Sequence, residues 1–113
     1  MDCLFCNIAH KECPSDIVYE TEQVIAFKDV NPQAPIHLLI IPKGHYNTLL
    51  DMHRQSPQTA IDMHEAVQTL VAENDLEDKG FRVVVNTGIS GGQTVFHVHY
   101  HLLGGRDMHW PPG

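Results

Sequence analysis

Cationic side chains are scarce in this sequence. Its 113 residues include 7 Lys and Arg against 14 Asp and Glu, which gives a formal net charge of -7 at pH 7. Proteins that bind duplex nucleic acid need clustered Lys and Arg to displace counterions from the phosphates, so this charge argues against a nucleic-acid partner. A phosphate ligand would have to be held locally, by a few well-placed groups.

Long apolar runs are also missing. No stretch approaches the roughly 18 apolar residues that cross a membrane, and residues 1–6 contain no basic segment leading into an apolar one. We therefore expect a cytoplasmic protein with no membrane partner. No G-x-x-x-x-G-K phosphate loop occurs. The cysteines number three, an odd count without a secretion signal, which favours reduced thiols or a metal site over a disulfide framework.

What is present indicates one globular domain, residues 1–113. Hydrophobic residues make up 42% of the chain and charged residues 19%, as in soluble folded proteins. No internal repeat or low-complexity segment interrupts it. A chain of this length has a real core, yet pairing with a second copy would help to bury its apolar faces.

Hydrophobic patterning predicts strands and one long helix. The strands are expected at residues 17–19 and 24–27, as a hairpin, at 36–41, buried on both faces, and at 81–86. Ser56 and Pro57 form a helix start, and the helix should run to about Asn74. Its apolar stripe, assigned to core packing, comprises Ala60, Met63, His64, Val67, Leu70 and Val71.

The segment with the clearest chemistry is residues 97–101, in which histidines alternate with Val98 and Tyr100. As a strand it would place His97, His99 and His101 on one face and the apolar residues on the other. Alternate rings would then stand about 6.6 Å apart, so one phosphate could touch two of them. The alternative is a half-buried strand whose polar face is merely rich in histidine.

Two loops could complete a phosphate site. Residues 87–94 are rich in Gly and short polar side chains, so their backbone N–H groups could hold an anion, although the same pattern fits a flexible turn. Residues 29–35 contain two prolines and present Asp29, which could bind ribose hydroxyls or be an ordinary turn carboxylate. His37, at the start of the buried strand, is either a core-edge histidine or part of the site.

Cys3 and Cys6 have a spacing that lets two thiols hold one metal ion. Half a zinc site, a redox pair and two small buried residues all remain open. His45 could be solvated or a metal ligand. Trp110, the one tryptophan, lies in a proline-containing tail that is expected to dock against the body or a partner subunit.

With these elements in place, residues 97–103 resemble the His-x-His-x-His-x-x motif of the histidine-triad (HIT) proteins. Residues 31–37, 84–86 and 91–96 and the ending 104–113 resemble the Hint branch, the adenosine 5'-monophosphoramidases. The resemblance covers nearly the whole chain from Cys3. It implies an α+β HIT fold, a five-stranded antiparallel sheet with one long and one short helix, and a homodimer across which the two sheets join.

The resemblance also implies a site for a purine nucleoside monophosphate and its phosphoramidates. His99 would be the nucleophile that forms a nucleotidyl-histidine, His101 would donate to a phosphoryl oxygen, and His37 would support the proton balance. No cofactor would be needed for catalysis. The nucleotide would contact Phe5, Ile8, Asp29, Val30, Asn86, Gly92, Gln93, Thr94, His99 and His101.

Two departures from the Hint pattern stand out. Thr94 occupies a position where Ser is usual, which keeps the catalytic hydroxyl but adds a methyl group that could crowd the leaving group. The Cys3–Cys6 pair resembles the zinc site of other family members, whose two histidine positions are filled here by His45 and His97. Four such ligands would suit a structural zinc.

Other functions fit the same sequence. Within the family, the substrate could be a dinucleoside polyphosphate or another nucleotidyl conjugate. A metal-dependent hydrolase could use alternate histidines of the run as ligands, although no third ligand or carboxylate base is evident. A nucleotide-binding scaffold dimer with vestigial activity is a third class, since an intact site does not reveal its use.

Overall fold

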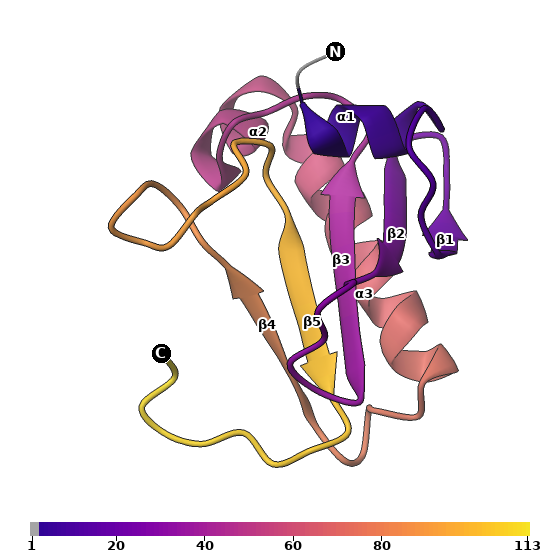
Figure 1. Ribbon diagram of the computed structural model, residues 1–113, viewed down its shortest axis with the longest axis vertical. Helices are drawn as coiled ribbons and strands as arrows, with labels where there is room; N and C mark the ends of the chain where they lie inside the picture. The colour runs from indigo at the N-terminus through magenta and orange to yellow at the C-terminus, as the bar shows by residue number, and fades with distance from the viewer. Residues whose placement is uncertain (1–2) are drawn as a thin grey trace.

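The structure, a computed structural model, describes residues 3–113. Its core is a five-stranded antiparallel sheet with the strand order β1-β2-β3-β5-β4 (Figure 1). The elements follow in the order α1 (Leu4–Ala9), β1 (Ile17–Glu20), β2 (Val24–Lys28), β3 (Ile36–Pro42), α2 (Leu49–Gln55), α3 (Pro57–Glu73), β4 (Phe81–Val85) and β5 (Tyr100–Gly104). This is the α+β architecture that the sequence predicts.

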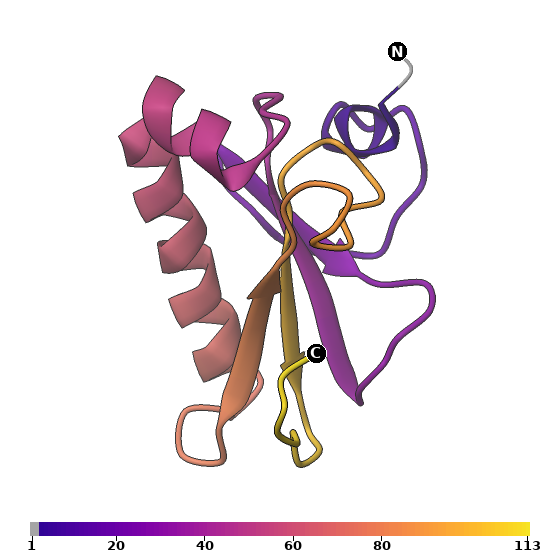
Figure 2. The same ribbon diagram turned by 90° about the vertical axis from the view of Figure 1, so that its left-hand side faces the viewer.

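The central strands are buried on both faces, because a different helix covers each (Figure 2). Alternating side chains of β2 and β3 divide between two cores. Val24, Ala26, Leu38 and Ile40 pack with the long helix α3, whereas Ile25, Phe27, Leu39 and Ile41 pack with α1. This two-sided burial explains why residues 36–41 read as an almost unbroken apolar run.

The strand expected over residues 97–101 is shorter at its start than predicted. β5 begins at Tyr100, opposite Ile40 of β3, and the segment that carries His97 and His99 is irregular. The backbone N–H of Val98 donates instead to the carbonyl of Tyr46, 2.8 Å away. The alternation nevertheless persists, because Val98, Tyr100 and Leu102 all enter the α3 core.

Helix α3 matches the expected helix, with two differences in detail. Ser56 stands at the N-cap, but its hydroxyl pairs with the hydroxyl of Thr59, 2.7 Å away, and caps no backbone N–H. His64 does not belong to the buried stripe. It is exposed, and its Nε2 lies 3.2 Å from the Tyr100 hydroxyl. The buried positions of the helix are Thr59, Met63, Ala66, Leu70 and Val71.

Beside α3 the structure contains two short helices, α1 and α2, one more than the resemblance implied. Thr48 is the N-cap of α2. Its hydroxyl oxygen accepts from the backbone N–H of Asp51 and its hydroxyl proton is directed to the Asp51 carboxylate, at 3.3 and 3.1 Å. Thr-x-x-Asp is close to a capping box, so a sequence signal for this helix was present. Within residues 3–113, no helix combines the length and apolar character that crossing a membrane requires.

Candidate active site and metal-ligand cluster

The three histidines that the resemblance assigns to catalysis lie on the α1 face of the sheet. The register pairs His37 with Leu103 and His101 with Leu39, which makes the two histidines diagonal neighbours on adjacent antiparallel strands. The rings of His99 and His101 have centroids 5.0 Å apart, and Phe5 of α1 meets the His99 ring edge-on at 5.0 Å. The strand register and α1 therefore bring the predicted catalytic residues together.

Hydrogen bonding fixes which nitrogen of His99 carries its proton. The Nδ1 of this buried ring lies 2.9 Å from the backbone carbonyl of His97. A carbonyl can only accept, so Nδ1 donates the N–H and Nε2 of the neutral ring keeps its lone pair. His99 thus presents a nucleophilic nitrogen away from the backbone.

His37 and His101 form a directed pair next to it. The backbone N–H of Gln33 donates to His37 Nδ1 at 3.0 Å, so the ring proton of His37 is on Nε2. His37 Nε2 lies 2.9 Å from His101 Nδ1, to which it donates this proton, and 3.4 Å from the Asp29 carboxylate. His101 then carries its own proton on Nε2. The chain of contacts from Gln33 to His101 is a relay with a defined polarity.

Burial keeps these rings neutral. Desolvation is the largest cause that lowers the pKa of His37 and of His99, and it outweighs the opposing effect of the Asp29 carboxylate. The pKa of His101 falls to about 4, first because of burial and then because of His99 and His37. All three rings are therefore uncharged at neutral pH, as the proton assignments above require.

A second cluster lies beside the first. Cys3 and Cys6, from the start of α1, meet His45 and His97, and their ligand atoms all lie within 4.8 Å of one another. Nδ1 of His97 is 3.4 Å from Cys3 Sγ and 3.5 Å from Cys6 Sγ, and Nδ1 of His45 is 3.2 Å from Cys6 Sγ. The cysteines are free thiols, and burial together with the neighbouring Cys3 raises the pKa of Cys6 to about 11.

This cluster meets the requirements of a tetrahedral zinc site. With Zn–S bonds of about 2.3 Å and Zn–N bonds of about 2.0 Å, ligand atoms stand about 3.3–3.8 Å apart, close to the spacing seen here. The other nitrogen of each histidine faces an acceptor, as metal-binding histidines require. Nε2 of His97 donates to the Pro42 carbonyl and Nε2 of His45 to Asn47 Oδ1, both at 2.8 Å.

Asp29, His37 and His101 are also close enough to hold a metal. Their hydrogen bonding opposes it. The Nδ1 of His37 faces the N–H of Gln33, a donor, so Nε2 cannot offer a lone pair unless that bond is lost. The same test that favours a metal at the cysteine cluster therefore favours a proton relay here, and it argues against a metal-dependent hydrolase built on these three residues.

The glycine-rich segment 87–94 forms a loop that is closed by its own hydrogen bonds and directly precedes the histidine run. Gly92 has a positive φ of 84°, and a Cβ on Gly91 would stand 2.2 Å from the carbonyl oxygen of Thr87, so both positions need glycine. Gln93 is buried within the loop. Its backbone N–H donates to the Gly88 carbonyl and its Oε1 accepts from the Gly88 N–H, at 3.0 and 2.9 Å.

The side chain of Gln93 has no free donor, because its Nε2 donates to the carbonyls of Asn47 and Val95 at 2.6 and 3.1 Å. It therefore shapes the loop through contacts within the protein. Thr94 is exposed, and a cavity of about 490 Å³ includes it together with Cys3, His45 and Asn47. Asn86 is half-buried at the end of β4.

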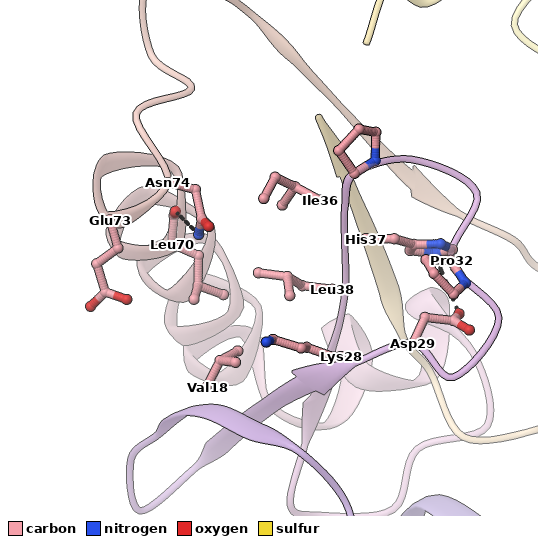
Figure 3. A pocket seen from close by; sticks show the side chains of 11 residues that line it. Val18, Lys28, Asp29, Pro32, Ile36, His37, Leu38, Leu70, Glu73 and Asn74 are labelled. Atoms are coloured by element: carbon pink, nitrogen blue, oxygen red, sulfur yellow. Dashed lines mark hydrogen bonds and ion pairs between the residues drawn. The ribbon is translucent and has the colours of Figure 1, made fainter. Parts of the chain in front are cut away.

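The residues expected around the base divide into two groups. Phe5 and Ile8 are buried in the α1 core, whereas Val30 is fully exposed on the loop after β2. A further cavity, of about 400 Å³, lies mainly on the α3 side of β3. Figure 3 shows Ile36 and Leu38 directed toward Leu70 of α3, while His37 and Asp29 lie on the other side of the strand.

Comparison with known proteins identifies the family. A family model described as the HIT domain matches residues 10–108. This chain belongs to the histidine-triad (HIT) family. A HIT family hydrolase from Legionella pneumophila superposes with a TM-score of 0.95 and is 45% identical, over 99% of this chain and 100% of that one.

Two relatives indicate its position within the HIT family. A 14 kDa zinc-binding protein of Zea mays is 48% identical over 97% of this chain and 87% of its own length. The adenylylsulfatase HINT1 of Arabidopsis thaliana is 41% identical over 97% of this chain and 76% of its own length. These matches support the Hint-like branch that the motifs indicated.

Sequence reasoning missed the groups that orient the HIT histidines. The backbone N–H of Gln33 and the side chain of Asn47 set the tautomers of His37 and His45. A backbone donor carries no residue signature, and Asn47 is an ordinary turn residue in sequence. The involvement of Asn47 depends on where the fold places it.

Acid should destabilise this HIT protein partly through His101. Because the folded-state pKa of His101 is about 4, below the ordinary value near 6.5, the unfolded chain takes up this proton first as the pH falls. The neutral His101 ring therefore makes its full contribution to the free energy of unfolding above pH 6.5. This contribution is lost as the pH falls from 6.5 to about 4. In urea unfolding at pH 7 and 4.5, His101→Gln should lose less stability than the wild type.

His53→Gln, at an exposed position on α2, is the matched control and should keep the wild-type pH dependence. An unchanged loss of stability in His101→Gln would contradict the assignment of a buried neutral ring.

Proposed function

We propose that this HIT protein hydrolyses purine nucleoside phosphoramidates through a covalent nucleotidyl-His99 intermediate. The observation that carries the proposal is the orientation of His99, whose Nδ1–H is bound to the His97 carbonyl at 2.9 Å and whose Nε2 is left with a lone pair. A neutral imidazole held in this way is a competent nucleophile. Family membership supports the same chemistry.

In the first step, Nε2 of His99 attacks the α-phosphorus, the P–Nε2 bond forms and the P–N bond to the amine breaks. The His99 ring gains positive charge as the bond forms, and the His97 carbonyl that accepts its Nδ1–H stabilises this charge. His101 donates its Nε2–H to a phosphoryl oxygen, supported by His37 and Asp29. The Thr94 hydroxyl gives its proton to the departing nitrogen as the P–N bond breaks, so the leaving group departs as the amine.

In the second step, water attacks phosphorus and gives one proton to the Thr94 oxygen, which restores that hydroxyl. The P–Nε2 bond breaks, and the nucleoside monophosphate leaves with His99 in its starting tautomer. The N–H groups of Gly92 and Gln93 are bound to the carbonyls of Ile89 and Gly88, so we expect the next N–H along the loop, that of Thr94, to donate to a phosphoryl oxygen. Asp29 would bind the ribose. Asn86 would lie near the phosphate, and the base would pack on Phe5, Ile8 and Val30.

A second substrate class has specific support. A relative that is 41% identical is named an adenylylsulfatase, so a nucleotidyl conjugate with an anionic leaving group is the alternative for this chain. Both substrates would share the His99 adduct and differ only in the leaving group. We expect the methyl group of Thr94 to affect the preference between the two leaving groups.

We further propose that the cluster of Cys3, Cys6, His45 and His97 holds a structural zinc. The donor set, its spacing and the hydrogen-bonded Nε2 atoms of both histidines support this, and a similar protein is named for zinc binding. The metal would tie α1 to the segment before β5. It would not take part in the chemical steps at His99.

A homodimer is proposed from the β4 side of the sheet. β4 is an edge strand that pairs only with β5 among the described strands, and it exposes Phe81 and Val83 by 42% and 37%. Leu50 of α2, which is 52% exposed, lines an apolar cavity together with Val83 and Val85 and so extends this surface. An unprotected apolar edge invites pairing with a second copy, which would join the two sheets.

His99→Ala should abolish turnover of an adenylated amine, by about 10³-fold or more, because the nucleophile is lost. Binding of AMP should survive. In acid-quenched wild-type reactions, mass spectrometry should detect a nucleotidyl adduct on the peptide that contains His99. His64→Ala, which removes an exposed histidine outside the site, should keep full activity. Unchanged turnover in His99→Ala would exclude the mechanism.

Purified protein should contain about one zinc per chain by elemental analysis. Cys6→Ser should lose most of it, because one of the four ligands is weakened. Cys13→Ser is the matched control, since Cys13 lies outside the cluster and should keep the metal. Wild-type protein with negligible metal after purification without chelators would contradict the proposed zinc.

Val83→Lys should weaken the dimer, because it places a charge on the apolar face of the edge strand. Sedimentation velocity should show a dimer for the wild type and a shift toward monomer for the variant. Glu22→Lys, at an exposed position in the β1–β2 turn at the opposite edge of the sheet, should remain dimeric. A monomeric wild type would contradict the proposal.

A further inference from the structure

The metal-ligand cluster and the phosphate loop are joined by a short chain of hydrogen bonds that passes through one residue. Asn47 accepts the Nε2–H of His45 with its side-chain oxygen, at 2.8 Å. Its backbone carbonyl accepts from Nε2 of Gln93, at 2.6 Å. One residue therefore contacts a proposed metal ligand on one side and the buried support of the phosphate loop on the other.

The Gln93 side of this chain controls the loop geometry. Gln93 is 4% exposed, and its Oε1 accepts the N–H of Gly88 while its backbone N–H returns to the Gly88 carbonyl. A shift of residue 47 would move Gln93, and with it both hydrogen bonds that close the loop. The groups expected to hold phosphoryl oxygens lie in this same loop.

At the other end of this hydrogen-bond chain, His45 is less firmly held than Gln93. His45 is exposed and lies on the turn after β3, and its contacts are with Cys6 Sγ, Asn47 and the ring of His97. Its Nδ1 lies 3.2 Å from Cys6 Sγ and is the nitrogen at which a metal held by the cluster would bind. Since Asn47 holds the opposite nitrogen, binding at Nδ1 and the position of residue 47 depend on each other.

We infer that Asn47 is a positioning residue that couples occupancy of the Cys3–Cys6–His45–His97 cluster to the geometry of the phosphate loop. The coupling rests on the proposed metal and phosphate sites. It is reciprocal, so zinc should tighten AMP binding by the same factor by which AMP tightens zinc binding. Asn47 is not among the residues proposed to bind the nucleotide or the metal, and it acts through His45 and Gln93.

The test compares Asn47→Ala with Asn47→Asp. Alanine removes the acceptor for His45 Nε2–H but keeps the backbone carbonyl, so zinc affinity, measured against a chromophoric chelator, should fall about 10- to 100-fold. Aspartate keeps an acceptor, so its affinity should stay near or above that of the wild type. Asn74→Ala, which removes a side-chain bond to Leu70 at the end of α3, is the matched control. It should change neither the zinc affinity nor the amide exchange of the phosphate loop.

Hydrogen exchange supplies a readout that needs no turnover. With zinc saturating, the amides of Gly88 and Gln93 should exchange at least several-fold faster in Asn47→Ala than in the wild type, while those of Ile25 and Ile41 in the central strands stay protected. Aspartate should restore slow exchange. A wild-type zinc affinity or unchanged loop exchange in Asn47→Ala would overturn the inference.

The outcome is separable from that of the proposed function. If no phosphoramidate is hydrolysed, the exchange and zinc measurements still decide the role of Asn47. If turnover occurs but the two zinc affinities of the wild type, with and without AMP, are equal, the coupling fails and the hydrolase assignment stands.

Discussion

The 2.9 Å hydrogen bond from His99 Nδ1 to the His97 carbonyl determines which nitrogen of the central histidine is free. It depends on an irregular segment, because β5 begins only at Tyr100 and the N–H of Val98 is bound to Tyr46. The side chain of His97 in turn belongs to the cysteine cluster. Thus one residue provides the orientation of the nucleophile through its backbone and is itself held through its ring.

Two neighbouring clusters use histidine in opposite ways. In the cysteine cluster, Nε2 of His45 and Nε2 of His97 donate to oxygen atoms, so Nδ1 of each ring can bind a metal. In the relay, Nδ1 of His37 accepts from the N–H of Gln33, so Nε2 of the neutral ring can only donate. Each cluster holds two histidines close to other possible metal ligands, and the partner of the second ring nitrogen decides the chemistry.

Much of this arrangement could be predicted from the sequence. The apolar run at residues 36–41 indicated a strand buried on both faces, Ser56 and Pro57 marked the long helix, and the histidine run with its flanking glycines identified the family. His64 was misassigned, because helical spacing alone does not distinguish the buried stripe from its edge, and this ring lies exposed beside Tyr100. The helix at residues 49–55 was missed although Thr48 and Asp51 signal its start.

The sequence by itself determined the local properties: which residues form strands and helices, which side chains can bind phosphate or metal, and which family the motifs belong to. These follow from periodicity and side-chain chemistry, which act over a few residues. Only the tertiary structure decided the tautomers of the histidines and the link from His45 through Asn47 to Gln93. The tautomers of His37, His45 and His99 depend on groups only two to four residues away, but the fold sets the direction in which those groups point. The bond from Gln93 to Asn47 joins segments 46 residues apart. A backbone N–H or carbonyl is the same in every residue until the fold places it.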